Sequence, residues 1–125
     1  MTMSNVELKV EVAVTSSDHA KGLQNRYALG EDEGMLFVFP DERTRSFWMR
    51  STPLRLSIAY CSATGHIIDV KDMNPFDESP VVSSGMAKYA IETNKGWFDK
   101  NNIGIGDQIV WKNDTVLFKK VGKNG

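Results

Sequence analysis

A short passage near the middle of the chain, Trp48-Met-Arg-Ser-Thr-Pro53, carries side chains that are common in recognition sites. Tryptophan and arginine are frequent anchors of binding surfaces, and hydroxyl and carboxylate groups add directional hydrogen bonds. Alternation in a later strand turns Glu92 away from the apolar face, so it can join this surface. We predict a non-catalytic surface that binds a small ligand or a protein, with six candidate residues: Trp48, Arg50, Thr52, Glu92, Asn25 and Arg26.

The same residues also fit a purely architectural role. In that case the Trp48 indole caps the core, and Arg50 pairs with Glu92 to hold the fold together. The two interpretations differ in the exposure of Trp48 and in the distance between Arg50 and Glu92. If the indole belongs to the core, Trp48→Ala should cost ~3 kcal/mol or more of stability.

A carboxylate-dependent hydrolase is a second interpretation. Hydrolysis by paired carboxylates needs two acids about 5–10 Å apart across a cleft. Glu92 and Asp69 both alternate away from the core, and Lys71 follows Asp69 on the same predicted strand. A Ser57–Lys71 dyad would need a lysine whose pKa desolvation lowers by several units. Beside Asp69 the opposite tendency is expected, so an ordinary polar cross-strand pair is favoured.

Metal and cofactor chemistry find little support in the sequence. His19 and His66 stand in different predicted elements, and Cys61 is the single cysteine, which excludes an internal disulfide and a cysteine-based metal site. The run Gly104-Ile-Gly-Asp107 precedes a predicted strand, and a phosphate loop precedes a helix and carries Lys-Ser/Thr. We therefore expect no metal and no cofactor.

Composition narrows the function classes further. The chain has 125 residues, enough for one domain, and its net charge of −1 gives no electrostatic attraction to nucleic acid. No stretch approaches the ~18 apolar residues of a membrane span, and the N-terminus lacks signal-peptide character. We expect a protein that is exported only if a leader has been removed. A third interpretation is a structural subunit of a larger assembly, such as a virion or envelope complex.

The first half of the chain reads as strands with one short helix. Alternation over residues 6–14 predicts a half-buried strand, with Val14 on its apolar face. Ser16-Ser17-Asp18 supplies capping side chains for a helix of about two turns. Three residues at helical spacing are predicted to face inward: Ala20, Leu23 and Tyr27. Residues 35–39 predict a buried strand that Pro40-Asp41 ends, and residues 46–50 predict the next strand.

The second half predicts antiparallel strands. The turn Ala63-Thr-Gly65 sets a hairpin register that places Tyr60 opposite Ile68, Ala59 opposite Asp69 and Ser57 opposite Lys71. A long loop is expected over residues 72–84, a strand over 88–93, a turn or helical turn over 96–102, and a last hairpin over 108–112 and 115–121. This pattern predicts a mainly β fold: a compact antiparallel β-sandwich or jelly-roll-like barrel with one or two short helices. One domain is expected over residues 1–121, with a flexible tail over 122–125.

Several passages in a fixed order resemble the domain-of-unknown-function family 192, whose members are small and often exported. They are Gly34-Met-Leu-Phe-Val-Phe39, Phe47-Trp-Met-Arg-Ser-Thr-Pro-Leu54, Ala90-Ile-Glu92 with Gly96, and Gly104-Ile-Gly-Asp107. The resemblance covers nearly the whole chain and implies a jelly-roll-like β fold with no established activity. Three positions depart from the family pattern: Gln24 follows Gly22-Leu23, Ser51 replaces an asparagine, and Ser57 replaces an acidic residue.

Overall fold

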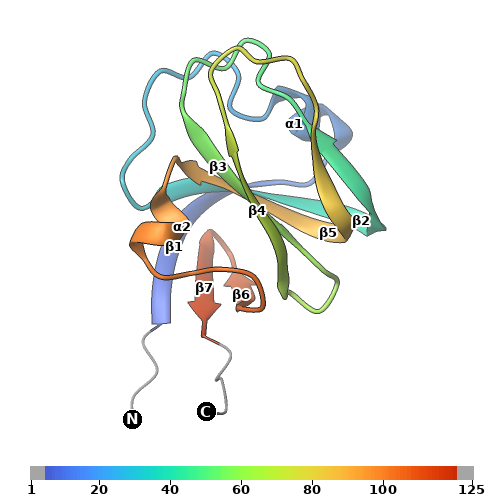
Figure 1. Cartoon of the computed structure of the whole chain (residues 1–125), viewed down its shortest axis with the longest axis vertical. Helices are drawn as coiled ribbons and strands as arrows, with labels where there is room; N and C mark the ends of the chain where they lie inside the picture. Colours follow the sequence, from blue (N-terminus) through green and yellow to red (C-terminus); the bar gives the residue numbers. More distant parts are fainter. Residues whose placement is uncertain (1–4, 121–125) are drawn as a thin grey trace.

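The computed structural model describes residues 5–120 and confirms a mainly β fold (Figure 1). Its elements are β1 (Asn5–Ala13), α1 (Ser16–Lys21), β2 (Glu33–Phe47), β3 (Leu56–Cys61), β4 (Ile67–Met73), β5 (Val81–Asn94), α2 (Trp97–Lys100), β6 (Gln108–Lys112) and β7 (Thr115–Lys119). The predicted tail, residues 122–125, lies outside the described residues. None of the helices between residues 5 and 120 has the length and apolar character needed to cross a membrane.

All seven strands form one curled sheet in the order β4-β3-β5-β2-β1-β7-β6. Neighbouring strands run antiparallel except β1 and β2, which are parallel and are connected through α1. An isolated bridge between His66 and Gln108 joins the two ends of the sheet. The Ile109 amide, which donates to the Gly65 carbonyl at 2.8 Å, supports this closure. The result is a half-barrel, in agreement with the predicted barrel-like class.

The region from β1 to α1 follows the predicted pattern with small shifts. Leu8 and Val10 are buried, but the end of the strand buries Ala13 and exposes Val14. The cap of α1 is Thr15 and not residues 16–18, because its hydroxyl accepts from the Asp18 amide at 3.0 Å.

The predicted inward face of the helix was largely wrong. Gly22, at φ +47°, ends α1 after six residues, so the helical spacing never reaches Tyr27. Leu23 is buried, whereas Ala20 is exposed and Tyr27 is 80% exposed.

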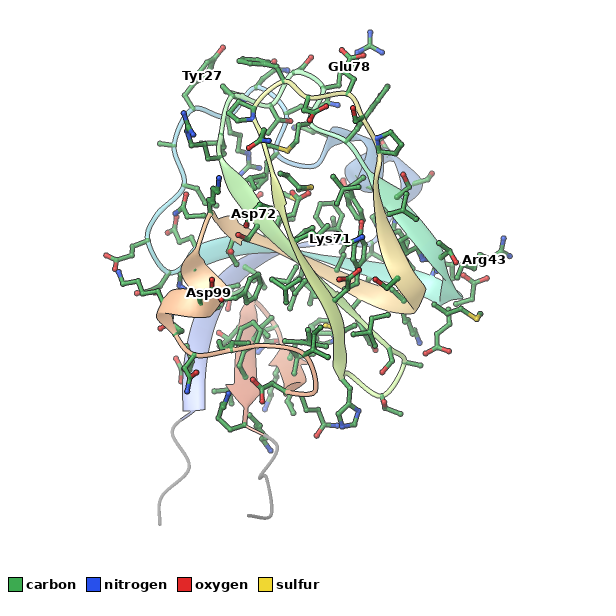
Figure 2. All side chains as sticks on the ribbon, in the orientation of Figure 1. Tyr27, Arg43, Lys71, Asp72, Glu78 and Asp99 are labelled. Carbon is green, nitrogen blue, oxygen red and sulfur yellow. The ribbon has the colours of Figure 1, made fainter. Side chains whose placement is uncertain are left out.

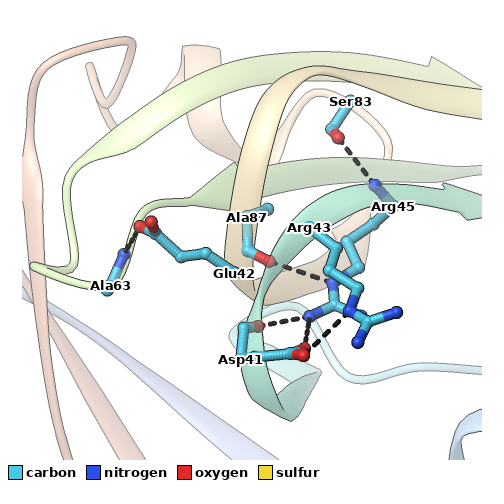
Figure 3. A network of polar contacts seen from close by, with 7 residues as sticks. All are labelled: Asp41, Glu42, Arg43, Arg45, Ala63, Ser83 and Ala87. Atoms are coloured by element: carbon cyan, nitrogen blue, oxygen red, sulfur yellow. Dashed lines mark hydrogen bonds and ion pairs between the residues drawn. The ribbon is translucent and has the colours of Figure 1, made fainter.

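The largest correction concerns β2, which is one long strand where the sequence predicted two. Its pairing with β5 shifts register between Val38 and Arg43, so Pro40 falls in an irregularity that needs no donor from its nitrogen. Arg45 holds this irregularity together (Figure 3): its Nε donates to the Ala87 carbonyl at 2.9 Å, and its terminal nitrogen bonds to Asp41 Oδ1 at 2.9 Å.

The β3–β4 hairpin also departs from its predicted register. The turn pairs Ser62 with His66 as expected. An irregularity between Tyr60 and Cys61 then shifts the remaining pairs of β3 and β4 by one residue from the predicted register. Tyr60 therefore faces Asp69, Ile58 faces Lys71 and Ser57 faces Asp72. The predicted pairs Ala59–Asp69 and Ser57–Lys71 were wrong, since a single extra residue reassigns every later pair. The later elements agree better, although β4 and β5 extend into the predicted 72–84 loop and leave residues 74–80 between them.

Two apolar clusters pack on opposite sides of the central strands. One gathers Trp97 and Phe98 of α2 with residues of β1, β6 and β7. The other gathers Phe37, Leu56 and Tyr60 with Leu23, which follows α1, and Met49, which follows β2. A pocket that contains Glu92 lies beside the second cluster.

Candidate functional site

A pocket of about 260 Å³, here called the Glu92 pocket, opens beside the second apolar cluster. One wall is α1 with the turn after it (residues 19–24), and another is the end of β2 with the following loop (residues 46–49). Phe39, Thr52 and Glu92 complete the lining. The volume lies just below the roughly 300 Å³ at which ligand pockets typically begin.

Glu92 reaches this pocket because of its place in β5. It pairs with Met35 of β2 and with Ile58 of β3, and residues directly opposite one another in a sheet share a face. Both partners belong to the second apolar cluster, so the Glu92 side chain enters the same apolar space. Alternation did turn Glu92 away from its neighbour Ile91, but the face that it occupies is covered by α1 and by the loop after β2.

The Glu92 carboxyl is buried and has no partner among the described residues. Glu92 is 4% exposed, and the structure gives its carboxyl no hydrogen bond or ion pair with any described residue. Every side-chain nitrogen or oxygen sealed from solvent within residues 5–120 does have a partner, so the Glu92 oxygens face the open space of the pocket. Burial raises the pKa of Glu92 to about 8, because desolvation penalises the charged form. At neutral pH the carboxyl is therefore mostly protonated.

A glycine fixes the backbone at this point. A Cβ atom on Gly34 would lie 2.3 Å from the Glu92 carbonyl oxygen, closer than any real side chain approaches. Gly34 therefore allows β2 to run close to β5 beside Glu92. This close approach holds the strand that carries the carboxyl.

Aromatic rings form much of the remaining wall. Phe39 packs against the His19 ring at a centroid distance of 4.5 Å, and Phe47 packs edge-on against Phe37 at 4.8 Å. Trp48 is 46% exposed and lies 5.5 Å from the Arg50 guanidinium, measured to the ring centroid. The pocket therefore combines one buried acid with rings that are held in place by their neighbours.

Three loops next to the pocket are tied together by backbone hydrogen bonds. They follow α1, β2 and β4, and they gather at the end of the molecule away from β6 and β7, where Figure 2 also shows Tyr27 and Glu78. The Asn25 amide donates to the Ser51 carbonyl at 2.7 Å, and the Phe76 amide donates to the Thr52 carbonyl at 3.0 Å.

Asn25, Ser51 and Phe76 all have φ near +60°. Such φ values are unusual for residues other than glycine and asparagine, and residues with such values tend to cluster at functional sites. Ser51 thus occupies a conformation that asparagine, the residue that the family resemblance implies there, would tolerate better.

The structure brings three of the six predicted site residues together. Trp48, Thr52 and Glu92 line the pocket. Arg50 is exposed and is not part of the lining, and the structure shows no ion pair between it and the buried Glu92. The architectural alternative, with an indole buried in the core and an Arg50–Glu92 pair, is therefore not what the described residues form.

The two residues predicted at the edge of the surface lie elsewhere. Asn25 contributes its backbone amide to the loop contact with Ser51. Arg26 binds the Glu11 carboxylate with both terminal nitrogens, the second at 2.6 Å, and it borders two other cavities beside β1. One of these cavities is also about 260 Å³, but four of its charges form two ion pairs, Arg26 with Glu11 and Lys9 with Asp114 at 3.3 Å, and its remaining acid, Glu33, accepts from the Gly30 amide at 3.0 Å.

The residues proposed for hydrolysis do not assemble around Glu92. Asp69 accepts from the Ser84 hydroxyl at 2.6 Å and lies 3.5 Å from the Lys71 ammonium group. Neither Asp69 nor Lys71 lines the pocket. Ser57, where the family resemblance implies an acid, alternates to the opposite face from Ile58 and bonds to Asp72 at 2.9 Å. That position therefore does not belong to the pocket.

Sequence reasoning missed the contribution of α1 to the pocket. His19, Lys21 and Leu23 all border it, and the His19 Nε2 donates to the Ala13 carbonyl at 2.9 Å. The one available signal was the Gly22-Leu23 pair of the family resemblance, because Gly22 ends the helix and directs Leu23 inward. Nothing in the spacing of these residues connects them to Glu92, which is far away in the chain.

The chain is similar to one family model and to solved structures. The sequence model of DUF192, described as an uncharacterized ACR, matches residues 1–111. A crystal structure of a protein of unknown function from Novosphingobium aromaticivorans DSM 12444 has a TM-score of 0.81 and 32% identity, covering 83% of this chain and 75% of that one. A Sinorhizobium meliloti 1021 protein, named as a candidate transcription regulator, has a TM-score of 0.79 and 26% identity, covering 86% and 94%. No curated protein matches the chain.

Proposed function

This chain belongs to the DUF192 family, and we propose that it binds a small molecule in the Glu92 pocket without catalysing a reaction. One observation carries the proposal: the Glu92 carboxyl is buried, has no partner among the described residues and faces an open cavity. A buried polar group without a partner costs free energy, and a ligand that supplies the partner recovers it. Aromatic and apolar side chains with a few polar groups are the usual composition of small-molecule sites, and the pocket has rings beside Glu92, Ser46 and Thr52.

Contacts around the pocket also fix its shape without a ligand. Gly34 allows the close approach of β2 and β5 at Glu92, and the strained loops beside Trp48 are locked to one another by hydrogen bonds. A preformed pocket of this kind needs little reorganisation when a ligand binds.

A second candidate function has one observation in its favour. A carboxyl whose pKa burial raises to about 8 is suited to donate or accept a proton near neutral pH. However, Glu92 is the one carboxyl among the described residues that line the pocket, so hydrolysis by two carboxylates lacks its second acid there. Binding therefore remains the proposal that the geometry supports best.

We do not extend the regulator name of the Sinorhizobium meliloti protein to this chain. The net charge of this chain, −1, gives no general attraction to the nucleic-acid backbone. Within residues 5–120 the helices have six and four residues, which is short for a recognition helix in the major groove. Our proposal accordingly names a small molecule and not a nucleic acid.

The test is a fragment screen followed by amide chemical shifts on the full chain. Fragments that bind in the pocket should shift amides of α1, of residues 46–52 and of Glu92 together. Glu92→Gln and Trp48→Ala should each weaken these fragments at least tenfold, whereas Trp111→Ala, on β6, should leave them unchanged. Fragments that shift only residues around β1, or that bind Glu92→Gln equally well, would contradict the proposal.

A further inference from the structure

We propose that the Glu92 pocket selects a small organic cation, an ammonium group on a compact apolar body, and that Glu92 binds it as a carboxylate after giving up its proton. The inference rests on the proposed function, because it names the ligand class of the same pocket. Three features support it: the acid that no cation neutralises, the rings around it, and the size of the cavity.

No cation within the described residues neutralises Glu92. On α1, the His19 Nε2 donates to the Ala13 carbonyl, and Lys21 is exposed, with its charge acting on Glu11 across the surface. On β3, the Tyr60 hydroxyl donates to the Val81 carbonyl at 2.6 Å.

The neighbouring acid on β4 has its own cation. Asp69 is held by Ser84 and paired with Lys71. Burial raises the pKa of Tyr60 first, and the charges of Glu92 and then Asp69 raise it further, so these groups add negative and not positive potential. The free position beside Glu92 therefore suits a positive group.

The rings of the pocket favour the same kind of ligand. The face of an aromatic ring attracts a cation within about 6 Å of its centroid. Two lining rings already make such contacts: the Arg45 guanidinium lies 4.0 Å from the Phe39 centroid, and that of Arg50 lies 5.5 Å from the Trp48 centroid. Neither arginine is part of the pocket lining, and a third cation inside would meet rings together with a carboxylate.

The cavity limits the size of the ligand. A volume of about 260 Å³ is the share of roughly eight waters in the liquid, so a ligand of about eight non-hydrogen atoms fits. An anion would meet the Glu92 carboxyl, and the one lysine of the lining, Lys21, lies at the exposed rim of the pocket. A neutral ligand could accept a hydrogen bond from protonated Glu92, and this is the competing class that the experiment must separate.

Proton balance gives the inference a signature. The O–H bond of the Glu92 carboxyl breaks, its proton passes to the buffer, and the carboxylate pairs with the ammonium group of the ligand. Each bound cation should therefore release up to one proton. Below about pH 8 the affinity for the cation should rise about tenfold per pH unit and then level off.

The experiment compares three probes of similar size on the full chain: benzylammonium, benzyl alcohol and benzoate. Amide shifts give the affinities at pH 6, 7 and 8.5, and calorimetry in buffers of different ionisation enthalpy counts the released protons. We expect benzylammonium to bind at least tenfold more tightly than benzyl alcohol at pH 8.5, with proton release at pH 7. Benzoate should bind most weakly.

Matched variants separate the carboxyl from general surface charge. Glu92→Gln should weaken benzylammonium at least tenfold more than it weakens benzyl alcohol. Glu7→Gln, on the exposed face of β1, removes the same charge elsewhere and should change neither affinity. The count of released protons uses the unmodified protein, so it stays informative even if Glu92→Gln folds poorly.

Different results would overturn the cation assignment and the proposed function. If benzyl alcohol or benzoate binds in the pocket more tightly than benzylammonium, or if the cation binds without proton release at pH 7, the cation assignment fails and pocket binding stands. If none of the probes shifts the pocket amides at millimolar concentration while other fragments do, the cation assignment fails as well. If no small molecule shifts them, the proposed function itself fails.

Discussion

Trp48 and Met49 are neighbours in the chain with opposite environments. The Trp48 indole is 46% exposed at the pocket, whereas Met49 is 2% exposed within the second apolar cluster, and its amide donates to the Asp77 carbonyl at 2.8 Å. Thr52 closes the turn through its amide, which donates to the Met49 carbonyl at 3.1 Å. Met49 thus anchors the loop, and Trp48 is presented to the pocket.

This contrast predicts a large difference between two adjacent alanine variants. Met49→Ala removes a buried side chain and should lower the free energy of unfolding by about 2–5 kcal/mol. Trp48→Ala should lower it by only about 1 kcal/mol, while fragment binding is lost. Urea denaturation of both variants gives the comparison. A loss of ~3 kcal/mol or more for Trp48→Ala would assign the indole to the core after all.

Glu92 should make stability depend on pH in a recognisable direction. Burial raises its pKa from the ordinary value of 4.5 to about 8, so between these values the folded state holds a proton that the unfolded state has lost. The contribution of Glu92 to the free energy of unfolding is then greatest at low pH, and it falls as the pH rises toward 8, by up to about 1.4 kcal/mol per pH unit.

Glu92→Gln isolates this contribution from every other titrating group. An amide does not ionise, so the variant should lose less stability than the wild type between pH 5 and pH 8. The measurement is a set of urea curves across that range for both proteins. Parallel pH profiles for the two would show that Glu92 titrates normally, and that its burial in the fold is less complete than described.

At the scale of elements, the close pairing of β2 with β5 sets the position of Glu92. Gly34→Ala would place a Cβ 2.3 Å from the Glu92 carbonyl oxygen, and the backbone cannot absorb this by a side-chain rotation. We expect a loss of about 1–3 kcal/mol or more in stability, together with weaker fragment binding. Gly104→Ala is the control, because nothing lies within 4 Å of its added Cβ and its φ is not positive. Equal melting temperatures for the two variants would contradict the close approach.

Local patterns in the sequence predicted the elements better than their pairing. Alternation found β1, β3 and the β6–β7 hairpin, although all six residues of β3 are buried because both faces of that strand are covered. It divided β2 at Pro40, since a proline normally ends a paired strand. The compensation comes from Arg45, whose bonds to Ala87 and Asp41 are contacts that no local pattern reveals. The hairpin register failed for a related reason, an irregularity next to Tyr60.

The candidate site shows the same division. Residue types and spacing singled out Trp48 and Thr52, which lie four positions apart in one loop. α1 covers the sheet face that carries Glu92 because it lies in the crossover between the parallel strands β1 and β2. The sequence alone did not predict this parallel pairing. The sequence predicted Arg26 at the edge of the site, but in the structure it binds Glu11. No local pattern connects these two residues, which lie 15 positions apart in the chain.

At the scale of the whole molecule, stability should depend on the contact that joins the two ends of the sheet. Gly65 lies at this closure, and a Cβ added to it would lie 2.8 Å from the Ile109 carbonyl oxygen. Gly106 has a similar positive φ, +96° against +84°, but nothing within 4 Å of its added Cβ. Gly65→Ala therefore adds a clash at the closure, whereas Gly106→Ala adds backbone strain alone, about 1–2 kcal/mol.

Cys61 provides the measurement for this comparison. It is the single cysteine of the chain and is buried in β3, the second strand from one end of the sheet, where burial raises the pKa of its thiol to about 12. Only the thiolate reacts readily, so labelling by a disulfide reagent should require opening of the sheet. We expect labelling to be fastest in Gly65→Ala, slower in Gly106→Ala and slowest in the wild type. If Cys61 is labelled equally fast in the two glycine variants, the rate of sheet opening depends on strain in the turns and not on the contact that closes the sheet.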